Sequence, residues 1–312
     1  METTKPRNII ADAPFDDPTD SIDLVIRTAD NVDYFVLSGL LSLRSPSSFF
    51  RHVLQANQHT EERDGFPILD VKEDSETFRM ILLLCYPYSS PEIKTVEQFV
   101  VVGKALTKYC MDHAWERFVK VVIASPLIRE QALRVFAHAV ANGWKELGEV
   151  AAKNTLHVSL DLEVELEDLR CIDALQYVRL RDYHKRCGKA AQDVMSVETD
   201  ICMPWLKEEV SKVLFLHDTT KCRWVGESIF YVHDWLSDYR VALMAEVLGR
   251  PFPEIARSED IIAQAAAKSI SACGHADWTK IAGTQIHRFA TLVAEEIDRL
   301  ISQVPLNIDW KK

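Results

Sequence analysis

The sequence is poor in glycine and lacks the short motifs that mark many enzymes. Its ten glycines form no G-x-G-x-x-G segment and no phosphate-binding loop ending in Lys and Ser or Thr. H-E-x-x-H and G-x-S-x-G are absent as well. These motifs place glycine, histidine or serine where nucleotide binding, zinc hydrolysis or acyl transfer requires them. Their absence excludes the common forms of those chemistries, and we expect a protein without catalytic activity.

Long apolar runs and regularly spaced cysteines are scarce too. The longest apolar run, residues 80–86, is far shorter than the about 20 residues that cross a bilayer. The first twenty residues contain no apolar stretch of the kind found in secretory signals. The cysteines are seven, an odd number, and are scattered along the chain, which is not the pattern of a disulfide framework. We therefore expect a protein of the cytoplasm or nucleus, not secreted, that binds no membrane.

Basic residues are fewer than acidic residues in this sequence. The chain has 36 Lys and Arg residues against 47 Asp and Glu residues, a net charge of −11 that is spread along its length. Such a chain repels phosphate backbones, so we expect no binding to nucleic acid. The composition, 47% hydrophobic and 27% charged, is that of a folded protein, and 312 residues are enough for two domains.

Strand-like patterns occur only near the beginning of the chain. Ile22, Leu24 and Ile26 alternate with polar residues, which predicts a half-buried strand. Asp30-Asn31 predicts a tight turn before a second strand at 33–36, and a third strand is expected at 68–71. Apolar residues then recur at helical spacing, with helices expected at 77–85, from the Thr95-x-x-Gln98 capping box onward, and at 113–124, 130–141, 145–156, 173–189 and 286–301. The predicted class is α+β, a head of short strands with flanking helices followed by an all-helical body.

The same patterns divide the chain. We expect a flexible arm at 1–17, a head at 18–124, a helical extension at 125–190, a C-terminal helical domain at 191–304 and a tail at 305–312. The arm is predicted to be mobile because it combines three prolines with acidic residues. The predicted core of the head consists of Phe35, Leu40, Leu41, Phe49, Phe78, Leu82, Leu106 and Tyr109.

Short motifs in the head follow one another in the order of a known family. They are Asp23-Leu24-Val25-Ile26, Tyr34-Phe35-Val36-Leu37, Leu40-Leu41-Ser42-Leu43-Arg44-Ser45-Pro46, Leu83-Leu84-Cys85-Tyr86-Pro87 and Ala105-Leu106-Thr107-Lys108-Tyr109-Cys110-Met111. In this order they resemble a BTB/POZ domain over about residues 15–125. The following helices, with Arg134-Val135-Phe136-Ala137-His138-Ala139 and Tyr183-His184-Lys185-Arg186-Cys187-Gly188, are similar to the BACK-like extension of fungal BTB proteins.

The resemblance implies a protein–protein interaction module without a cofactor, which forms a homodimer or docks a protein partner. The candidate surface residues are Asp23, Leu37, Ser38, Val71 and Glu73. Leu37-Ser38 stands where many members have a His-Lys or His-Arg pair. Val71-x-Glu73 approximates the hydrophobic-x-Glu element through which some members dock a cullin, so a ubiquitin-ligase adaptor is an alternative. The prolines of the arm disfavour the N-terminal helix that supports dimers in this family, so both modes of association stay open.

Scattered cysteines and histidines in the body suggest a further alternative, a zinc-stabilised helical module. The candidate ligands are His184, Cys187, Cys202, Cys222, Cys273 and His275. Thiolate and imidazole hold tetrahedral zinc, and His184 and Cys187 share one helix face. No C-x-x-C pair occurs, however, and a free cysteine is commonly a small buried apolar residue. We therefore expect packing roles and no bound metal. A catalytic Cys273 with His275 lacks a local oxyanion hole and is disfavoured.

Overall fold

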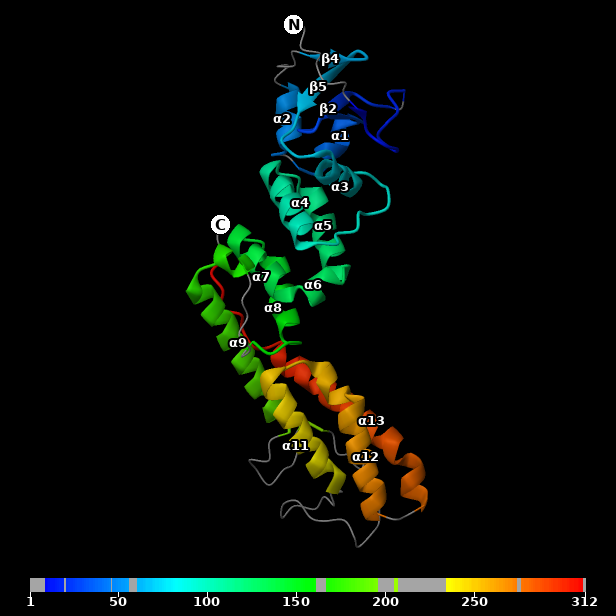
Figure 1. Cartoon of the computed structure of the whole chain (residues 1–312), viewed down its shortest axis with the longest axis vertical. Helices are drawn as coiled ribbons and strands as arrows, with labels where there is room; N and C mark the ends of the chain where they lie inside the picture. Colours follow the sequence, from blue (N-terminus) through cyan, green and yellow to red (C-terminus); the bar gives the residue numbers. More distant parts are fainter. Residues whose placement is uncertain are drawn as a thin grey trace. The chain divides into compact units, whose positions relative to one another are not determined.

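The computed structural model describes residues 9–19, 21–45, 47–55, 61–160, 167–195, 205–206, 234–273 and 276–310 (Figure 1). Among the described residues, strands occur only within the first 70, and the residues after them are helical or irregular. The predicted α+β class, with a small sheet followed by a helical body, is confirmed. The chain divides into two compact units, residues 1–151 with 310–312 and residues 152–309.

The first unit contains a five-stranded mixed sheet. Strands β2 (Leu24–Arg27) and β3 (Val32–Val36) form an antiparallel hairpin in which Val25 lies opposite Phe35. Asn31, in the turn, has a positive φ of 62°, as the Asp-Asn pair predicted. The order across the sheet is β1-β3-β2-β5-β4, with β1 at Ile9–Ile10, β4 at Glu62–Arg63 and β5 at Phe66–Asp70.

Both faces of the central strands are buried, which differs from the half-buried strand that alternation predicted. Leu24, Val25 and Ile26 have no exposed surface. Tyr34 packs against Phe78 of helix α3 (Ser75–Cys85), with ring centroids 6.1 Å apart. On the other face, a second cluster covers the sheet. It consists of Val25, Phe35 and Ile68, with Ile22 and Phe66 packed against it.

Capping residues mark an end of three helices in the first unit. The Asp74 carboxylate accepts a hydrogen bond from the Thr77 amide at 2.8 Å, and the Thr95 hydroxyl accepts one from the Gln98 amide at 3.2 Å. The other helices of this unit are α1 (Ser38–Leu41), α2 (Phe49–Gln55), α4 (Val96–Lys108), α5 (Asp112–Ala124), α6 (Leu127–Glu130) and α7 (Ala132–Asn142), and α8 (Lys145–Thr155) runs across the boundary at residue 151. Gly143, with φ 75°, ends α7 in the left-handed conformation.

An aromatic cluster joins α4 and α5 to the turn that follows α7. The Trp144 ring lies 5.3 Å from Phe99 and 5.4 Å from Trp115. It also lies against Gly103 of α4, where a Cβ atom would overlap the indole. Trp144 is therefore buried between these helices, and α6 and α7 belong to the same unit as the sheet. The sequence-based division after residue 124 separates helices that the structure groups together.

Of the predicted mobile arm at 1–17, residues 1–8 lie outside the described residues, and residues 9–15 are packed onto the head, which differs from the mobility that the prolines predicted. The Ile9 amide donates to a carbonyl of the hairpin turn at 3.1 Å, and the Ala11 amide donates to a carbonyl of β3 at 3.0 Å. The Phe35 amide donates to the Phe15 carbonyl at 3.1 Å. The Phe15 side chain is buried against Tyr34. Arg79 also donates to the backbone of this segment. One aromatic anchor and several backbone hydrogen bonds thus outweigh the local effect of the prolines.

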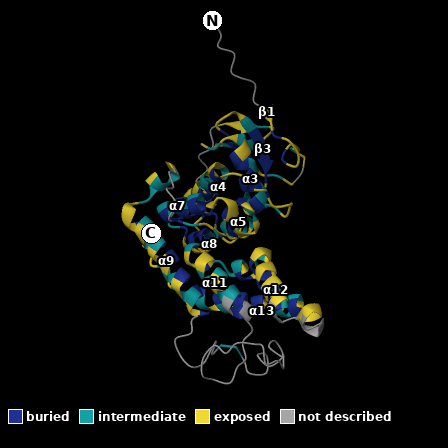
Figure 2. Ribbon diagram, turned by 60° about the horizontal axis from the view of Figure 1, so that its bottom comes forward, coloured by how far each residue is buried: buried dark blue, intermediate teal, exposed yellow. Residues whose placement is uncertain are grey.

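The second unit is a helical bundle. Its elements are η1 (Glu167–Cys171), α9 (Ala174–Asp193), α11 (Asp234–Gly249), η2 (Pro253–Arg257), α12 (Glu259–Cys273) and α13 (Ala276–Ile301). Helix α13 contacts α9, α12 and η2. Its predicted apolar stripe is confirmed, because Ile286, Phe289, Val293 and Ile297 have no exposed surface. Figure 2 shows that the helices of this unit are exposed mainly on their outer sides.

The segment after α13 is held along α9. The Gln176 side-chain amide donates to the Asp309 carbonyl at 2.9 Å and accepts from the Asp309 amide at 3.4 Å. Arg186 donates to the Pro305 carbonyl at 2.9 Å, and Arg179 forms an ion pair with the Asp309 carboxylate. The predicted tail is therefore a docked segment over residues 305–309.

Candidate interaction surfaces

Three of the five predicted surface residues meet where β2 begins and β3 ends. The Ser38 amide and hydroxyl both donate to the Asp23 carboxylate, at 2.6 and 2.7 Å. The Leu37 amide donates to the Tyr86 hydroxyl at 2.6 Å. The side chain of Leu37 is left 37% exposed. The structure thus brings Asp23, Leu37 and Ser38 together at the surface of the head.

Sequence reasoning missed the two tyrosines beside this group. The rings of Tyr86 and Tyr88 are stacked with centroids 5.7 Å apart. The Phe15 ring forms a T-shaped contact with each of them. Arg117 holds their loop by donating to the Tyr86 and Tyr88 carbonyls. Burial raises the pKa of Tyr86 to about 12, so this hydroxyl stays protonated at neutral pH. The spacing of two tyrosines around Pro87 was the available signal.

The outer edge of the sheet carries exposed apolar side chains. Ile9 and Ile10 of β1 are 63% and 45% exposed. Residues 9–15 follow β3 as far as Phe15, which contacts Tyr88. The N-terminal strand is therefore connected, through Phe15 and the tyrosines, to the group around Leu37. We call the exposed apolar residues along this path the edge surface: Ile9, Ile10, Leu37 and Tyr88.

The other two predicted residues are engaged inside the head. Val71 is buried, and its amide donates to the Arg27 carbonyl at 2.8 Å. The Glu73 side chain is 13% exposed, accepts from Lys108 at 2.9 Å and accepts a short hydrogen bond from the Tyr109 hydroxyl. Burial opposes ionisation of Glu73, but the hydrogen bonds from Tyr109 and Lys108 outweigh it and lower the pKa of this carboxyl. Val71 and Glu73 therefore support the fold rather than the edge surface.

Replacing Glu73 with glutamine is expected to weaken the acid sensitivity of the fold. A carboxyl whose pKa is lowered by folding stabilises the protein above its unfolded pKa, and this stabilisation is lost as the pH falls through the folded pKa. At pH 7 the variant should be less stable by about 1 kcal/mol, because charge-assisted hydrogen bonds are lost. Urea unfolding at pH 7 and below pH 4 should show the two free energies converging in acid.

The control for this experiment is Glu92→Gln. The Glu92 side chain is 74% exposed and has only a 3.3 Å surface ion pair with Lys94. This variant should follow the wild-type pH dependence. A Glu73→Gln curve that runs parallel to wild type at every pH would contradict the assigned role of Glu73.

A buried ion network lies at the end of the β2–β3 hairpin. The Asp33 side chain has no exposed surface, and its carboxylate accepts from the Arg27 guanidinium at 2.7 and 3.0 Å. Arg63 of β4 forms a second, short ion pair with the same carboxylate. The hydrogen bond to Asp33 is the main cause that raises the pKa of Arg27. One acidic side chain therefore ties β2, β3 and β4 together.

The described zinc candidates are buried and otherwise engaged. The His184 ring lies 3.0 Å from the Val158 carbonyl through Nε2, and Cys187 has no exposed surface. Burial raises the pKa of the Cys187 thiol to about 11, as expected for a thiol packed inside a helical bundle. The structure groups no three His, Cys, Asp or Glu side chains as a metal site among the residues that it describes. Cys202, Cys222, His275 and the Cys273 side chain lie outside the described residues.

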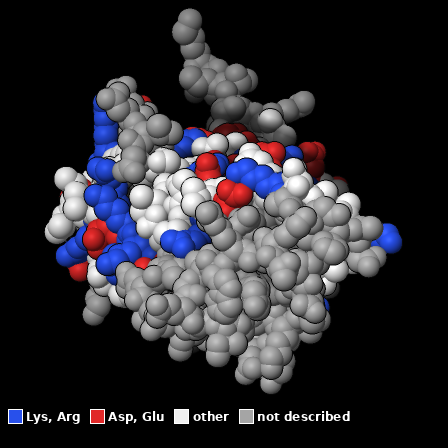
Figure 3. All heavy atoms as spheres, turned by 90° about the horizontal axis from the view of Figure 1, so that it is seen from below, with Lys and Arg blue, Asp and Glu red and all other residues white. Residues whose placement is uncertain are grey.

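Comparisons with known proteins do not assign this chain to a family. No family model matches it, and no curated protein matches its sequence. The resemblance to BTB/POZ domains therefore stays a prediction. Within the described ranges, every helix is too short or too polar to cross a membrane. On the face viewed in Figure 3, basic side chains gather along one side with acidic side chains among them.

Proposed function

We propose that this chain is a non-enzymatic protein–protein interaction protein that associates through the edge surface of its head, by self-association or by docking a protein partner. The observation that carries the proposal is the exposure of Ile9 and Ile10 on an edge strand of the sheet. Natural proteins generally protect such strands with charges, bulges or covering segments. An edge strand with two large exposed apolar residues is favourable for association.

The backbone of β1 offers hydrogen bonds as well as apolar contact. The amides of Ile9 and Ala11 point toward β3, because both donate to carbonyls on that side. Backbone groups alternate in direction along a strand, so those of Ile10 point away from β3. A partner strand added at this edge would satisfy them, which is the usual mode of β-strand addition. The apolar residues Leu37 and Tyr88 extend the surface beyond the strand.

The residues behind the alternative functions have other roles in the structure. Docking of a cullin through Val71-x-Glu73 would require a buried valine and a glutamate that Lys108 and Tyr109 already engage. Zinc binding through His184 and Cys187 would require two buried side chains to leave their present partners. These observations favour association through the edge surface over an adaptor or a zinc-stabilised module.

Self-association is tested by light scattering on the full chain at increasing concentration. We expect the wild-type mass to rise toward that of a dimer, and Ile10→Lys to remain monomeric because a lysine on an edge strand opposes pairing. The matched control is Val101→Lys on α4, because Val101 is 44% exposed and Ile10 is 45% exposed. Equal behaviour of the two variants would contradict a role for the edge.

If the wild-type chain stays monomeric, self-association is rejected and partner docking is tested directly. A photo-crosslinking amino acid is placed at position 10 or, as the control, at position 101 of the full chain in cells. We expect discrete crosslinked products from position 10 and none from position 101. Absence of products from position 10 would reject the proposed surface.

A further inference from the structure

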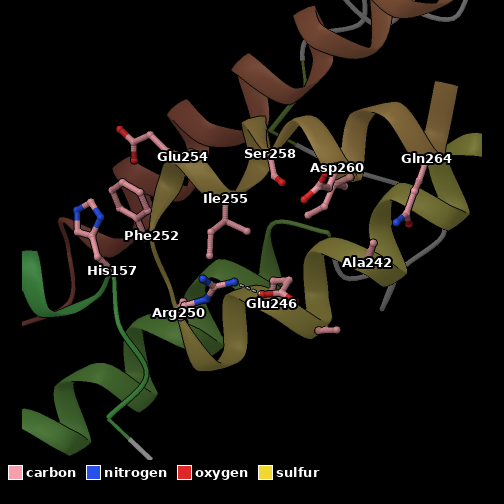
Figure 4. A pocket seen from close by; sticks show the side chains of 12 residues that line it. His157, Ala242, Glu246, Arg250, Phe252, Glu254, Ile255, Ser258, Asp260 and Gln264 are labelled. Atoms are coloured by element: carbon pink, nitrogen blue, oxygen red, sulfur yellow. Dashed lines mark hydrogen bonds and ion pairs between the residues drawn. The ribbon is translucent and has the colours of Figure 1, made fainter.

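The second unit contains a cavity of about 550 Å³ between α11 and α12 (Figure 4). Its walls come from four places in the chain: the turn after α8, helix α11, the η2 segment and the first turns of α12. A volume of this size is typical of ligand sites. None of the residues assigned to the edge surface contributes to it.

The base of the cavity is apolar. Ile261 is 7% exposed and belongs to the core of the unit, and the half-buried Ile255 continues this apolar surface. At one end the Phe252 ring packs against the His157 ring (Figure 4). The cavity can therefore accept an aliphatic or aromatic side chain in contact with buried residues.

The rim of the cavity is acidic and open to solvent. Glu246, Glu254 and Asp260 are exposed, and Arg250 supplies the one guanidinium among the lining residues that the structure describes. Arg250 is already in an ion pair with Glu246 one turn earlier on α11 (Figure 4). Neither Glu254 nor Asp260 has an ion-pair partner in the part of the chain that the structure describes. Among the described residues of the lining, three carboxylates and one guanidinium leave two net negative charges around an apolar base.

From this combination we infer that the cavity binds a segment of a partner protein that carries a basic side chain next to an aliphatic one. The aliphatic group lies on Ile255 and Ile261, and the basic group reaches the carboxylate of Asp260. Ser258 and Gln264 line the same cavity. Their side chains can donate hydrogen bonds to the backbone of the segment and accept hydrogen bonds from it. A protein segment fits better than an enclosed small molecule because the rim is exposed along both helices. This inference does not depend on association of the head.

The probe is the acetylated and amidated pentapeptide Gly-Leu-Arg-Leu-Gly, titrated against the full chain by ligand-observed NMR. Two further peptides separate the contributions: Gly-Leu-Glu-Leu-Gly reverses the charge, and Gly-Gly-Arg-Gly-Gly removes the apolar groups. We expect measurable binding of the first peptide only. No binding of the first peptide, or equal binding of all three, would overturn the inference.

Two adjacent residues provide a matched pair of variants. Asp260 lines the cavity, whereas Glu259 does not and has an 82% exposed side chain. Asp260→Lys should weaken binding at least about tenfold, which corresponds to about 1.4 kcal/mol. Glu259→Lys makes the same change of net charge and should weaken binding less than about twofold, because exposed charges are screened. Equal weakening would show non-specific attraction and would reject the site.

A charge-neutral variant tests whether binding requires the open cavity. Ala245 is exposed on α11, so Ala245→Trp fills the cavity without entering the core. We expect loss of peptide binding with an unchanged far-ultraviolet circular dichroism spectrum. Retained binding in this folded variant would contradict the inference.

Discussion

Phe78→Ala is expected to lower the free energy of unfolding of the first unit by about 3–5 kcal/mol. Phe78 has no exposed surface and packs between Tyr34 of β3 and Phe50 of α2, with ring centroids 6.1 and 6.4 Å away. Removing the ring leaves a cavity where the sheet meets two helices. Urea unfolding followed by tryptophan fluorescence measures the loss, since Trp115 and Trp144 lie in the same unit.

Phe49→Ala is the control for this experiment. The sequence placed Phe49 in the core beside Phe78, but in the structure it is 38% exposed and its neighbour Phe50 is fully buried. Phe49 still contacts Phe50 and Tyr109 by its ring, so its loss should cost about 1 kcal/mol. Similar losses for the two variants would contradict the packing described here.

Asp33→Asn is expected to destabilise the first unit by about 3 kcal/mol. The variant keeps the shape of the side chain but removes the charge that two guanidinium groups share. Breaking a buried ion pair by removing one partner costs about 3–5 kcal/mol, and the lower value applies because Arg27 and Arg63 can turn partly toward water. The free energy of unfolding at pH 7 measures the effect.

Asp64→Asn makes the same chemical change on the same arginine. The Asp64 carboxylate lies 3.7 Å from Arg63, but its side chain is 60% exposed. Asparagine also tolerates the positive φ of 52° at this position. We expect a change of less than about 0.5 kcal/mol, as for other exposed ion pairs. A loss at Asp64 equal to that at Asp33 would mean that burial of the network does not determine its strength.

Local patterns were sufficient for most elements of the fold. Apolar spacing predicted the strands of the hairpin and the stripe of α13, and the capping box at Thr95 predicted where α4 begins. Apolar spacing and the Thr95-x-x-Gln98 box act within a few residues, so they can be read without knowing the tertiary contacts. The tertiary contacts themselves could not be read in this way.

The residues whose burial was predicted wrongly have one feature in common. Their burial depends on contacts with parts of the chain that are distant in sequence. Phe49 and Phe50 are adjacent on a short helix, and local spacing alone did not show which one faces the core. The burial of Phe15 depends on Tyr34, Tyr86 and Tyr88. In the candidate site, the resemblance indicated Asp23, Leu37 and Ser38, but nothing local indicated that Val71 is buried. The same holds for the position of Tyr86 and Tyr88.

The hydrogen bonds between α9 and the segment after α13 bear on how the second unit folds. Gln176 is 5% exposed and meets Asp309, a residue 133 positions later in the sequence. Contacts of such long sequence separation slow folding, because a large loop must be closed before they form. The buried amide of Gln176 has its backbone partners only after that closure. The second unit should therefore complete its folding in a late, slow step, after its individual helices have formed.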